Sequence, residues 1–193
     1  MPPSCRLHLV VPALPPGDAT ACLAAACEAG DVASIVVPAG LVTALAPFAR
    51  SRDVALIVRD DMEMAKDPAA DGVEIATPEE CREARRRFGT SRIVGARSGS
   101  SRHMAMELAD AGADYIAFAQ DEPSWSDEPI IAWWADLFEI PCIAGDPVEP
   151  GEVATLLTQR PDFIRPSEAM WLSADDSRRI IGETMRAIAE GGQ

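Results

Sequence analysis

Three short stretches, Ala70-Asp71-Gly72-Val73, Ala113-Asp114-Tyr115-Ile116 and Pro161-Asp162-Phe163-Ile164, share the pattern x-Asp-x-[Val/Ile]. Each stands where a helical segment gives way to a short apolar run. An aspartate at such a junction hydrogen-bonds nearby backbone as the chain turns into the next strand. A junction that recurs in this way indicates a fold built from similar βα units.

Apolar and helical segments alternate outward from these junctions. Eight apolar runs predict strands at residues 7–11, 32–37, 54–58, 72–75, 93–96, 115–118, 142–144 and 163–164. Eight segments of helical composition follow them, at residues 18–29, 41–50, 62–66, 78–88, 100–111, 130–138, 149–158 and 174–189. Because the strands are apolar rather than alternating apolar with polar, we expect a parallel sheet covered by helices.

Two α/β architectures accommodate this order of elements. One is a closed (β/α)8 barrel and the other is an open, doubly wound sheet. The first strand is not followed by a GxGxxG motif, which weakens the dinucleotide-binding version of the open sheet. The count of eight favours a compact (β/α)8 TIM barrel, with residues 1–193 forming a single domain.

Charge and composition limit the partners. The 193 residues carry 17 basic and 31 acidic side chains, a net charge of −14, which argues against nucleic-acid binding. No run approaches the roughly 20 apolar residues of a membrane helix. The five cysteines are scattered, without CxxC spacing, so we expect reduced thiols and a cytoplasmic protein. A homo-oligomer is compatible with this sequence.

Candidate site residues follow from the barrel, whose ligands bind at the carboxyl ends of the strands. Asp60 and Glu79 follow two neighbouring strands, and Mg²⁺ takes one or two such carboxylates. The alternative is that they cap helices or pair with arginine. Arg59 and Arg97 are suited to clamp an anion bidentately, or else form structural ion pairs with those same carboxylates.

Small residues and histidines at the strands are less specific. Ser98, with the glycine and serine after it, precedes a helix, where backbone amides cradle a phosphate or where the serines simply cap the helix. His8 lies within the first strand, and we interpret it as a satisfied core histidine rather than a catalyst. We expect His103 to lie at the surface. A small-molecule ligand at the barrel mouth is the expected partner.

Several segments at these strand ends resemble the thiamine phosphate synthase/TenI family. The clearest are Ala55-Leu-Ile-Val-Arg-Asp60, Ala70-Asp-Gly-Val-Glu-Ile75, Ile93-Val-Gly95, Gly112-Ala-Asp-Tyr115 and Ile140-Pro-Cys-Ile-Ala-Gly145. They are similar to the family's Ile-Asn-Asp, Ala-Asp-Gly-Val-His-Leu, Ile-Ile-Gly, Gly-Ala-Asp-Tyr and Ile-Pro-Val-Val-Ala-Ile-Gly-Gly segments. The resemblance implies a compact (β/α)8 barrel.

The resemblance also implies an activity. The family synthase joins a hydroxymethylpyrimidine diphosphate to a thiazole phosphate, releasing pyrophosphate with Mg²⁺. Asp60 and Glu79 fall on its two magnesium-binding aspartates, and Arg97 replaces a pyrophosphate-binding serine. Gly145 falls on a Gly-Gly phosphate loop and Ser167 on a final Val-Ser-Ala phosphate loop.

This sequence also departs from the family. Arg59 replaces an asparagine, and the Thr-rich loop ending in lysine corresponds to residues 123–127, which contain no lysine. Asp146 and Glu168 stand beside the expected monophosphate site, where each like-charge contact costs on the order of 1 kcal/mol. We therefore expect weak or altered activity.

Three hypotheses follow. In the first, the chain is a synthase-like transferase whose catalytic residues include Asp60 and Glu79. In the second, it is a non-catalytic binding or assembly barrel, which predicts Arg59 paired with Asp60 or Glu79 and a closed pocket. In the third, it is another small-molecule enzyme with Glu74 as general base, at the position of the histidine that the family's TenI branch uses.

Overall fold

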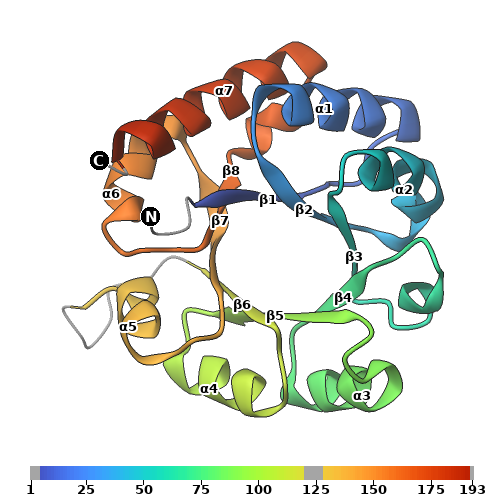
Figure 1. Ribbon diagram of the computed structural model, residues 1–193, viewed down its shortest axis with the longest axis vertical. Coiled ribbons are helices and arrows are strands. Elements are labelled where there is room, and N and C mark those ends of the chain that lie inside the picture. The colour runs from blue at the N-terminus through green and yellow to red at the C-terminus, as the bar shows by residue number, and fades with distance from the viewer. Residues whose placement is uncertain (1–4, 120–127, 192–193) are drawn as a thin grey trace.

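Eight parallel strands close into one barrel in sequence order, and the last strand pairs with the first (Figure 1). The computed structural model describes residues 5–119 and 128–191. The strands are β1 Arg6–Val10, β2 Val32–Val37, β3 Ala55–Arg59, β4 Gly72–Ile75, β5 Ile93–Gly99, β6 Tyr115–Phe118, β7 Cys142–Val148 and β8 Phe163–Pro166. The predicted (β/α)8 barrel is confirmed.

Seven α-helices within the described residues surround the strands. They are α1 Pro16–Ala29, α2 Val42–Ser51, α3 Pro78–Phe88, α4 Arg102–Asp110, α5 Ile130–Leu137, α6 Val153–Leu157 and α7 Ala174–Gly191. Short 3-10 turns add η1 Ala39–Leu41, η2 Met64–Lys66, η3 Pro150–Glu152 and η4 Glu168–Trp171. The helices form the outer ring seen in Figure 1.

The short helix predicted at residues 62–66 forms as the 3-10 helix η2 over Met64–Lys66 and not as an α-helix. The side chain of Asp61 accepts hydrogen bonds from the backbone nitrogens of Glu63 at 3.0 Å and Met64 at 2.9 Å. These bonds favour a turn over an α-helix, since a short polar side chain satisfies the backbone groups that a helix would otherwise use.

The repeated aspartates join strands in pairs. Each accepts a hydrogen bond on its carboxylate from a backbone nitrogen of the preceding strand, at 2.7–2.8 Å. Each also donates its own backbone N–H to the carbonyl of the same residue. The partners are Leu56 on β3 for Asp71, Val94 on β5 for Asp114 and Cys142 on β7 for Asp162. The repeat that predicted the fold therefore fixes the entry of β4, β6 and β8.

The barrel wall separates two cores. Outward side chains of the strands pack against the helices in one large cluster that includes Leu7 and Leu9 of β1. A smaller cluster fills the barrel interior, formed by Val36, Ile57, Tyr115, Ala117 and Ile143. Since adjacent residues of a strand point to opposite sides, the residues between outward ones face the interior. The inner cluster forms a floor beneath the carboxyl ends of the strands.

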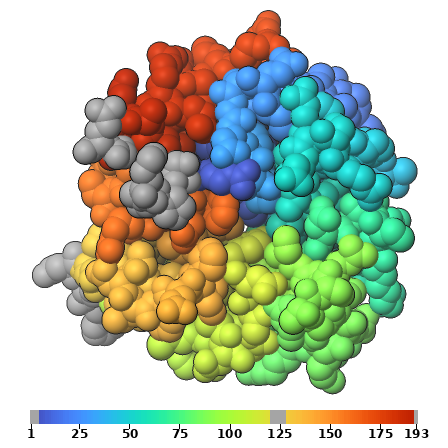
Figure 2. All heavy atoms as spheres, in the orientation of Figure 1, coloured from blue at the N-terminus to red at the C-terminus, as the bar shows by residue number. Residues whose placement is uncertain are grey.

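The ring closes where α1 packs against α7. In Figure 2 the colours follow one another around the molecule in sequence order, so each βα unit occupies its own sector. All five cysteines are free thiols, and four of them are buried. None of the helices within the described residues is long and apolar enough to cross a membrane. The cytoplasmic location stays a prediction.

Candidate functional site

A cavity of about 400 Å³ opens at the carboxyl ends of the strands. Its polar lining comes from β1, β3, β4, β5, β7 and β8. Its walls between these groups are apolar or small. The lining residues are His8, Val10, Arg59, Glu74, Ala76, Arg97, Gly99, Ala117, Phe118, Ala119, Gly145, Asp146 and Arg165.

Glu74 is a buried carboxylate at the centre of this cavity, with both oxygens engaged. Oε1 accepts hydrogen bonds from Nη2 of Arg59 at 2.9 Å and from Nη1 of Arg97 at 3.2 Å. Oε2 accepts the hydroxyl of Tyr115 at 3.0 Å. Burial alone would raise the pKa of Glu74, but the nearby His8 and the two arginines outweigh it and hold that pKa well below its usual range. Glu74 is therefore an ionised anchor for its neighbours.

Tyr115 reaches Glu74 because Gly95 on the neighbouring strand has no side chain. A Cβ on Gly95 would lie 2.0 Å from the ring Cζ of Tyr115 and 2.2 Å from its hydroxyl oxygen. Burial and the adjacent charge of Glu74 raise the pKa of Tyr115, so the phenol stays protonated and donates to the carboxylate. Sequence reasoning missed this role, since Tyr115 matched only a scaffold segment.

Arg97 links Glu74 to Asp60 at the rim. Its Nη2 donates to both carboxylate oxygens of Asp60, at 2.8 and 3.0 Å. Asp60 has a φ of 54°, in the left-handed region that aspartate tolerates better than most residues. Burial lowers the pKa of Arg97, but Asp60 and Glu74 more than offset this and the pKa is raised. The alternative prediction of an ion pair is met for Arg97 and Asp60, whereas Arg59 pairs with Glu74 rather than with Asp60 or Glu79.

The two predicted magnesium ligands do not form a metal site as they are placed. Both oxygens of Asp60 are bonded to Arg97. The Glu79 side chain, in the first turn of α3, is 81% exposed and lies 3.8 Å from Arg82. Within the described residues, no three His, Cys, Asp or Glu side chains group as metal ligands do. The donor chemistry suits Mg²⁺, but this arrangement does not fit it, and the magnesium site stays a prediction.

The predicted phosphate-binding residues divide into two groups. Gly145 lines the cavity, and its carbonyl accepts Nη1 of Arg165 at 3.0 Å. Ser98 and Ser167 are buried and do not line it. The hydroxyl of Ser98 donates to the neighbouring carbonyl of Gly99 at 3.2 Å. Sequence reasoning did not assign a role to Arg165, which points into the cavity from β8.

Ser101 and Ser167, rather than Ser98, cap helical segments. The helix α4 is capped by Ser101, whose side chain accepts the backbone nitrogen of Met104 at 3.1 Å. Ser167 donates to the carboxylate of Glu149 and caps η4. The second acidic residue expected near a phosphate, Glu168, pairs with Arg165. Residues 123–127, the segment without a lysine, lie outside the described residues.

His8 is buried, as predicted, but only one of its ring nitrogens is satisfied. Nδ1 lies 2.8 Å from the hydroxyl of Ser34, the residue opposite it on β2. Within the described residues, Nε2 has no hydrogen-bond partner and lies 3.7 Å from Oε2 of Glu74. The interpretation as a core histidine holds for its burial and for Nδ1 but not for Nε2, and its not being a catalyst stays a prediction. The available signal was a polar residue in an otherwise apolar strand, between two leucines that face outward. His103 is exposed, as predicted.

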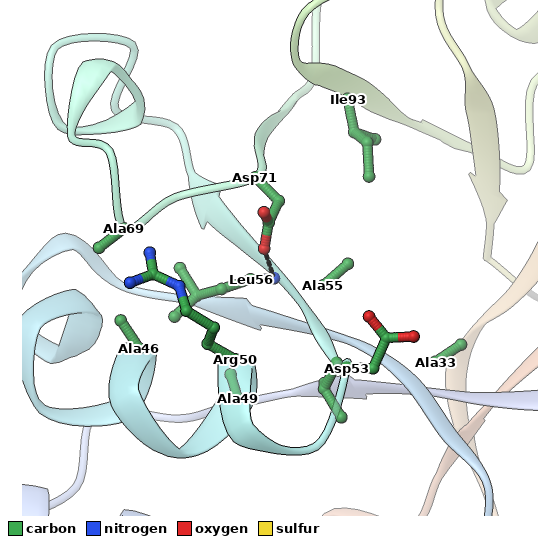
Figure 3. A pocket seen from close by; sticks show the side chains of 11 residues that line it. Ala33, Ala46, Ala49, Arg50, Asp53, Ala55, Leu56, Ala69, Asp71 and Ile93 are labelled. Carbon is green, nitrogen blue, oxygen red and sulfur yellow. Dashed lines mark hydrogen bonds between the residues drawn. The ribbon is translucent and has the colours of Figure 1, made fainter.

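A second cavity, of about 280 Å³, lies between α2 and the amino-terminal ends of the strands (Figure 3). In Figure 3 the carboxylate of Asp71 points at the backbone nitrogen of Leu56, the Arg50 side chain extends toward Ala69, and Asp53 points elsewhere. Arg50 donates to the carbonyl of Pro68 at 3.2 Å. These polar groups do not converge, and this end of a barrel serves stability.

The chain resembles known proteins along most of its length. Residues 18–164 match the family described as thiamine monophosphate synthase. A thiamine-phosphate synthase of Rhodospirillum centenum is 37% identical over 188 residues, covering 86% of this chain and 89% of that relative. One from Erythrobacter litoralis is 34% identical over 161 residues, covering 78% and 75%. The structure of thiamine phosphate pyrophosphorylase from Pyrococcus furiosus superposes with a TM-score of 0.79 and 21% identity over 98% of both chains, a likeness of fold. These matches confirm the resemblance seen in the sequence.

Proposed function

The chain belongs to the thiamine monophosphate synthase family, and from this premise we propose that it joins a hydroxymethylpyrimidine diphosphate to a thiazole phosphate in the barrel mouth. The observation that carries the proposal is the convergence of Arg59, Arg97 and Arg165 on one cavity from three different strands. Arginine presents a planar fork of donors that matches phosphate oxygens, so three of them suit a substrate pair with several phosphates.

The reaction requires little beyond positioning and charge stabilisation. The thiazole ring nitrogen forms a bond to the pyrimidine methylene carbon, and the bond from that carbon to the diphosphate oxygen breaks. Pyrophosphate leaves with the bonding electron pair, and the thiazole nitrogen becomes a cation. Arg59 and Arg97 would stabilise the negative charge that develops on the leaving oxygen, as preorganised donors do in a cavity of restricted water access.

The ion pairs that Arg59 and Arg97 form with carboxylates are the basis for expecting weak activity. Arg97 binds Asp60 and Glu74, and Arg59 binds Glu74. A diphosphate must compete with these carboxylates for the guanidinium groups. Asp60 is about half exposed and can turn toward water, so it is the partner that a diphosphate displaces. Substrate binding is therefore weaker than in a site with free arginines.

The direct test is incubation of the purified protein with both substrates, with detection of thiamine phosphate by mass spectrometry and of released pyrophosphate. Arg97→Met removes the charge and should abolish turnover. The matched control is Arg86→Met, since Arg86 pairs with Glu83 on the exposed face of α3. Absence of product from the wild type would refute the transfer reaction, and a lack of binding of millimolar pyrophosphate as well would refute a phosphate site in this cavity.

Two possible roles of Asp60 can be distinguished by measuring pyrophosphate binding. If Asp60 competes with the ligand for Arg97, Asp60→Asn should bind pyrophosphate more tightly than the wild type does in the absence of metal. If Asp60 is a magnesium ligand, Asp60→Asn should bind pyrophosphate more weakly than the wild type does in the presence of Mg²⁺, and should lose activity. Isothermal titration of both proteins with pyrophosphate, in Mg²⁺ and in EDTA, distinguishes the two roles.

A second candidate function is binding without catalysis. The observation in its favour is that each cavity arginine has a carboxylate partner: Glu74 for Arg59, Asp60 for Arg97 and Glu168 for Arg165. It predicts saturable binding of thiamine phosphate with no turnover. Use of Glu74 as a general base stays a prediction, and its lowered pKa weighs against it, because a strongly acidic carboxyl is a weak base.

A further inference from the structure

We propose that His8 determines specificity in this cavity by donating a hydrogen bond from its Nε2 to an acceptor on the organic part of a phosphorylated ligand. The inference rests on the proposed function for its choice of ligand. Nothing in the resemblance to known synthases assigns a role to this position. The observations that carry it are a buried nitrogen that has no hydrogen-bond partner within the described residues and its place in the lining of the cavity.

Two buried side-chain nitrogens or oxygens have no hydrogen-bond partner within the described residues, Nε2 of His8 and Nε of Arg59. Both belong to residues that line the cavity at the barrel mouth. An unsatisfied buried donor costs about 1–3 kcal/mol, so its retention calls for an explanation such as a ligand. Their shared position points to a ligand that occupies the cavity.

The neighbours of His8 fix which ring nitrogen carries the proton. The hydroxyl of Ser34 is adjacent to Nδ1 and can donate to it. A lone pair on Nε2 would face the ionised carboxylate of Glu74 at 3.7 Å and be repelled, whereas an Nε2–H would be attracted. The charge of Glu74 therefore favours the tautomer with the proton on Nε2. His8 thus presents a donor, and the ligand group that it recognises is an acceptor.

The polar groups of the cavity differ in their exposure. The side chains of Arg59 and Arg97 are about one-third exposed, whereas His8 is almost fully buried. The lining also includes the apolar Val10 and Ala117, and the carboxylate of Glu74 lies 3.7 Å from Nε2 of His8. Tyr115 offers no further donor, since its hydroxyl already donates a hydrogen bond to Glu74. A ligand with phosphate at the rim and an organic ring below meets one donor at the floor, His8.

The ligand class follows from this arrangement. It carries phosphate, which the arginines bind, and an organic ring small enough for a cavity of about 400 Å³. That ring bears a nitrogen or oxygen acceptor without a proton, aimed at His8. A ring with a donor at this position would leave two donors facing each other and bind more weakly. His8 thereby selects among phosphorylated molecules that the arginines alone would not distinguish.

Two substitutions separate the two nitrogens of His8. In His8→Asn the side-chain amide reaches the position of Nδ1 but not that of Nε2. In His8→Gln the amide reaches the position of Nε2 and can supply an N–H there. The probes are thiamine phosphate, which has rings and a phosphate, and inorganic pyrophosphate, which has charge only. Binding of each is measured by isothermal titration, with His103→Asn as an exposed control and the Tm of each variant recorded.

We expect His8→Asn to weaken thiamine phosphate binding about tenfold, the factor that corresponds to one hydrogen bond of ordinary strength. His8→Gln should restore most of that affinity, and pyrophosphate binding should be the same in all proteins. Ser34→Ala leaves His8 in place but removes the hydroxyl that donates to Nδ1, so it should also lower the affinity for thiamine phosphate, by a smaller factor.

Equal binding of thiamine phosphate by the wild type and His8→Asn would overturn the inference. So would a parallel loss of both probes in His8→Asn and His8→Gln, since that pattern indicates a structural role. A wild type that binds neither probe overturns both the inference and the proposed function. A selective effect of His8→Asn on thiamine phosphate, in a protein without turnover, supports the inference while overturning the transferase proposal.

Discussion

Gly95→Ala is the substitution whose consequence the structure specifies most sharply. The added methyl carbon would lie 2.0 Å from the ring Cζ of Tyr115, which is closer than non-bonded carbon atoms approach each other. The ring cannot stay where it is, because the strand backbones of β5 and β6 are hydrogen-bonded to each other and hold the two residues in register. Moving the ring breaks the 3.0 Å hydrogen bond from its hydroxyl to Glu74.

The expected cost combines two effects. Overpacking a well-packed interior destabilises by about 1–3 kcal/mol. Loss of a hydrogen bond to a buried charged group adds about 1.5–3 kcal/mol. The sum, about 2.5–6 kcal/mol, is a large part of the 5–15 kcal/mol that typically separates folded from unfolded states.

Urea denaturation followed by circular dichroism measures this change. The double variant Gly95→Ala/Tyr115→Ala removes the ring that the methyl group would strike, so the added cost of Gly95→Ala should nearly vanish in that background. The matched control is Gly182→Ala, since a Cβ at Gly182 in α7 meets nothing within 4 Å. It should stabilise by about 0.5–1 kcal/mol. Equal costs of Gly95→Ala with and without the Tyr115 ring would refute the reasoning.

Three further predictions concern other parts of the molecule. Asp114→Ala removes the 2.7 Å bond to the backbone of Val94 and should lower the free energy of unfolding by about 1–3 kcal/mol in urea titrations. Because the folded pKa of Glu74 is lowered, its charge contributes stability above roughly pH 5 that is lost as the pH falls; the stability difference between wild type and Glu74→Gln should be constant above that pH and shrink below it. Burial raises the pKa of Cys5 and Cys142 to about 12, so a thiol reagent at pH 8 should label both only after unfolding, as peptide mass spectrometry will show.

The fold was predictable because its signals are local. The aspartate of each repeated junction bonds a strand that precedes it by 15 to 20 residues, so the pattern is visible within single βα units. The capping box of Thr77 and Glu80 likewise marks the start of α3 from residues three apart. The 3-10 form of the short helix at residues 62–66 was not predictable from composition, because composition does not show that Asp61 accepts backbone hydrogen bonds there.

The site was predictable only in part, because its geometry depends on which side of each strand faces inward. Arg59, Glu74, Arg97 and Gly145 meet in one cavity, as their places at strand ends suggested. A strand that is apolar on both sides does not reveal its inward face from sequence, so the roles of His8 and of Tyr115 were missed. Likewise, the room that Gly95 makes for Tyr115 comes from a neighbouring strand.

At the barrel mouth, acidic side chains form ion pairs with the arginines of the cavity. Each of the three cavity arginines is matched by a carboxylate, and these carboxylates differ in how freely they can move. Glu74 is 1% exposed and cannot leave, whereas Asp60 is 49% and Glu168 62% exposed. Exposed ion pairs contribute only about 0–1 kcal/mol, so a phosphate can displace the two outer carboxylates into water at small cost. The inner carboxylate then keeps the guanidinium groups of Arg59 and Arg97 in place while the outer positions receive the ligand. The carboxylates paired with the cavity arginines thus comprise one fixed anchor, Glu74, and two replaceable partners, Asp60 and Glu168.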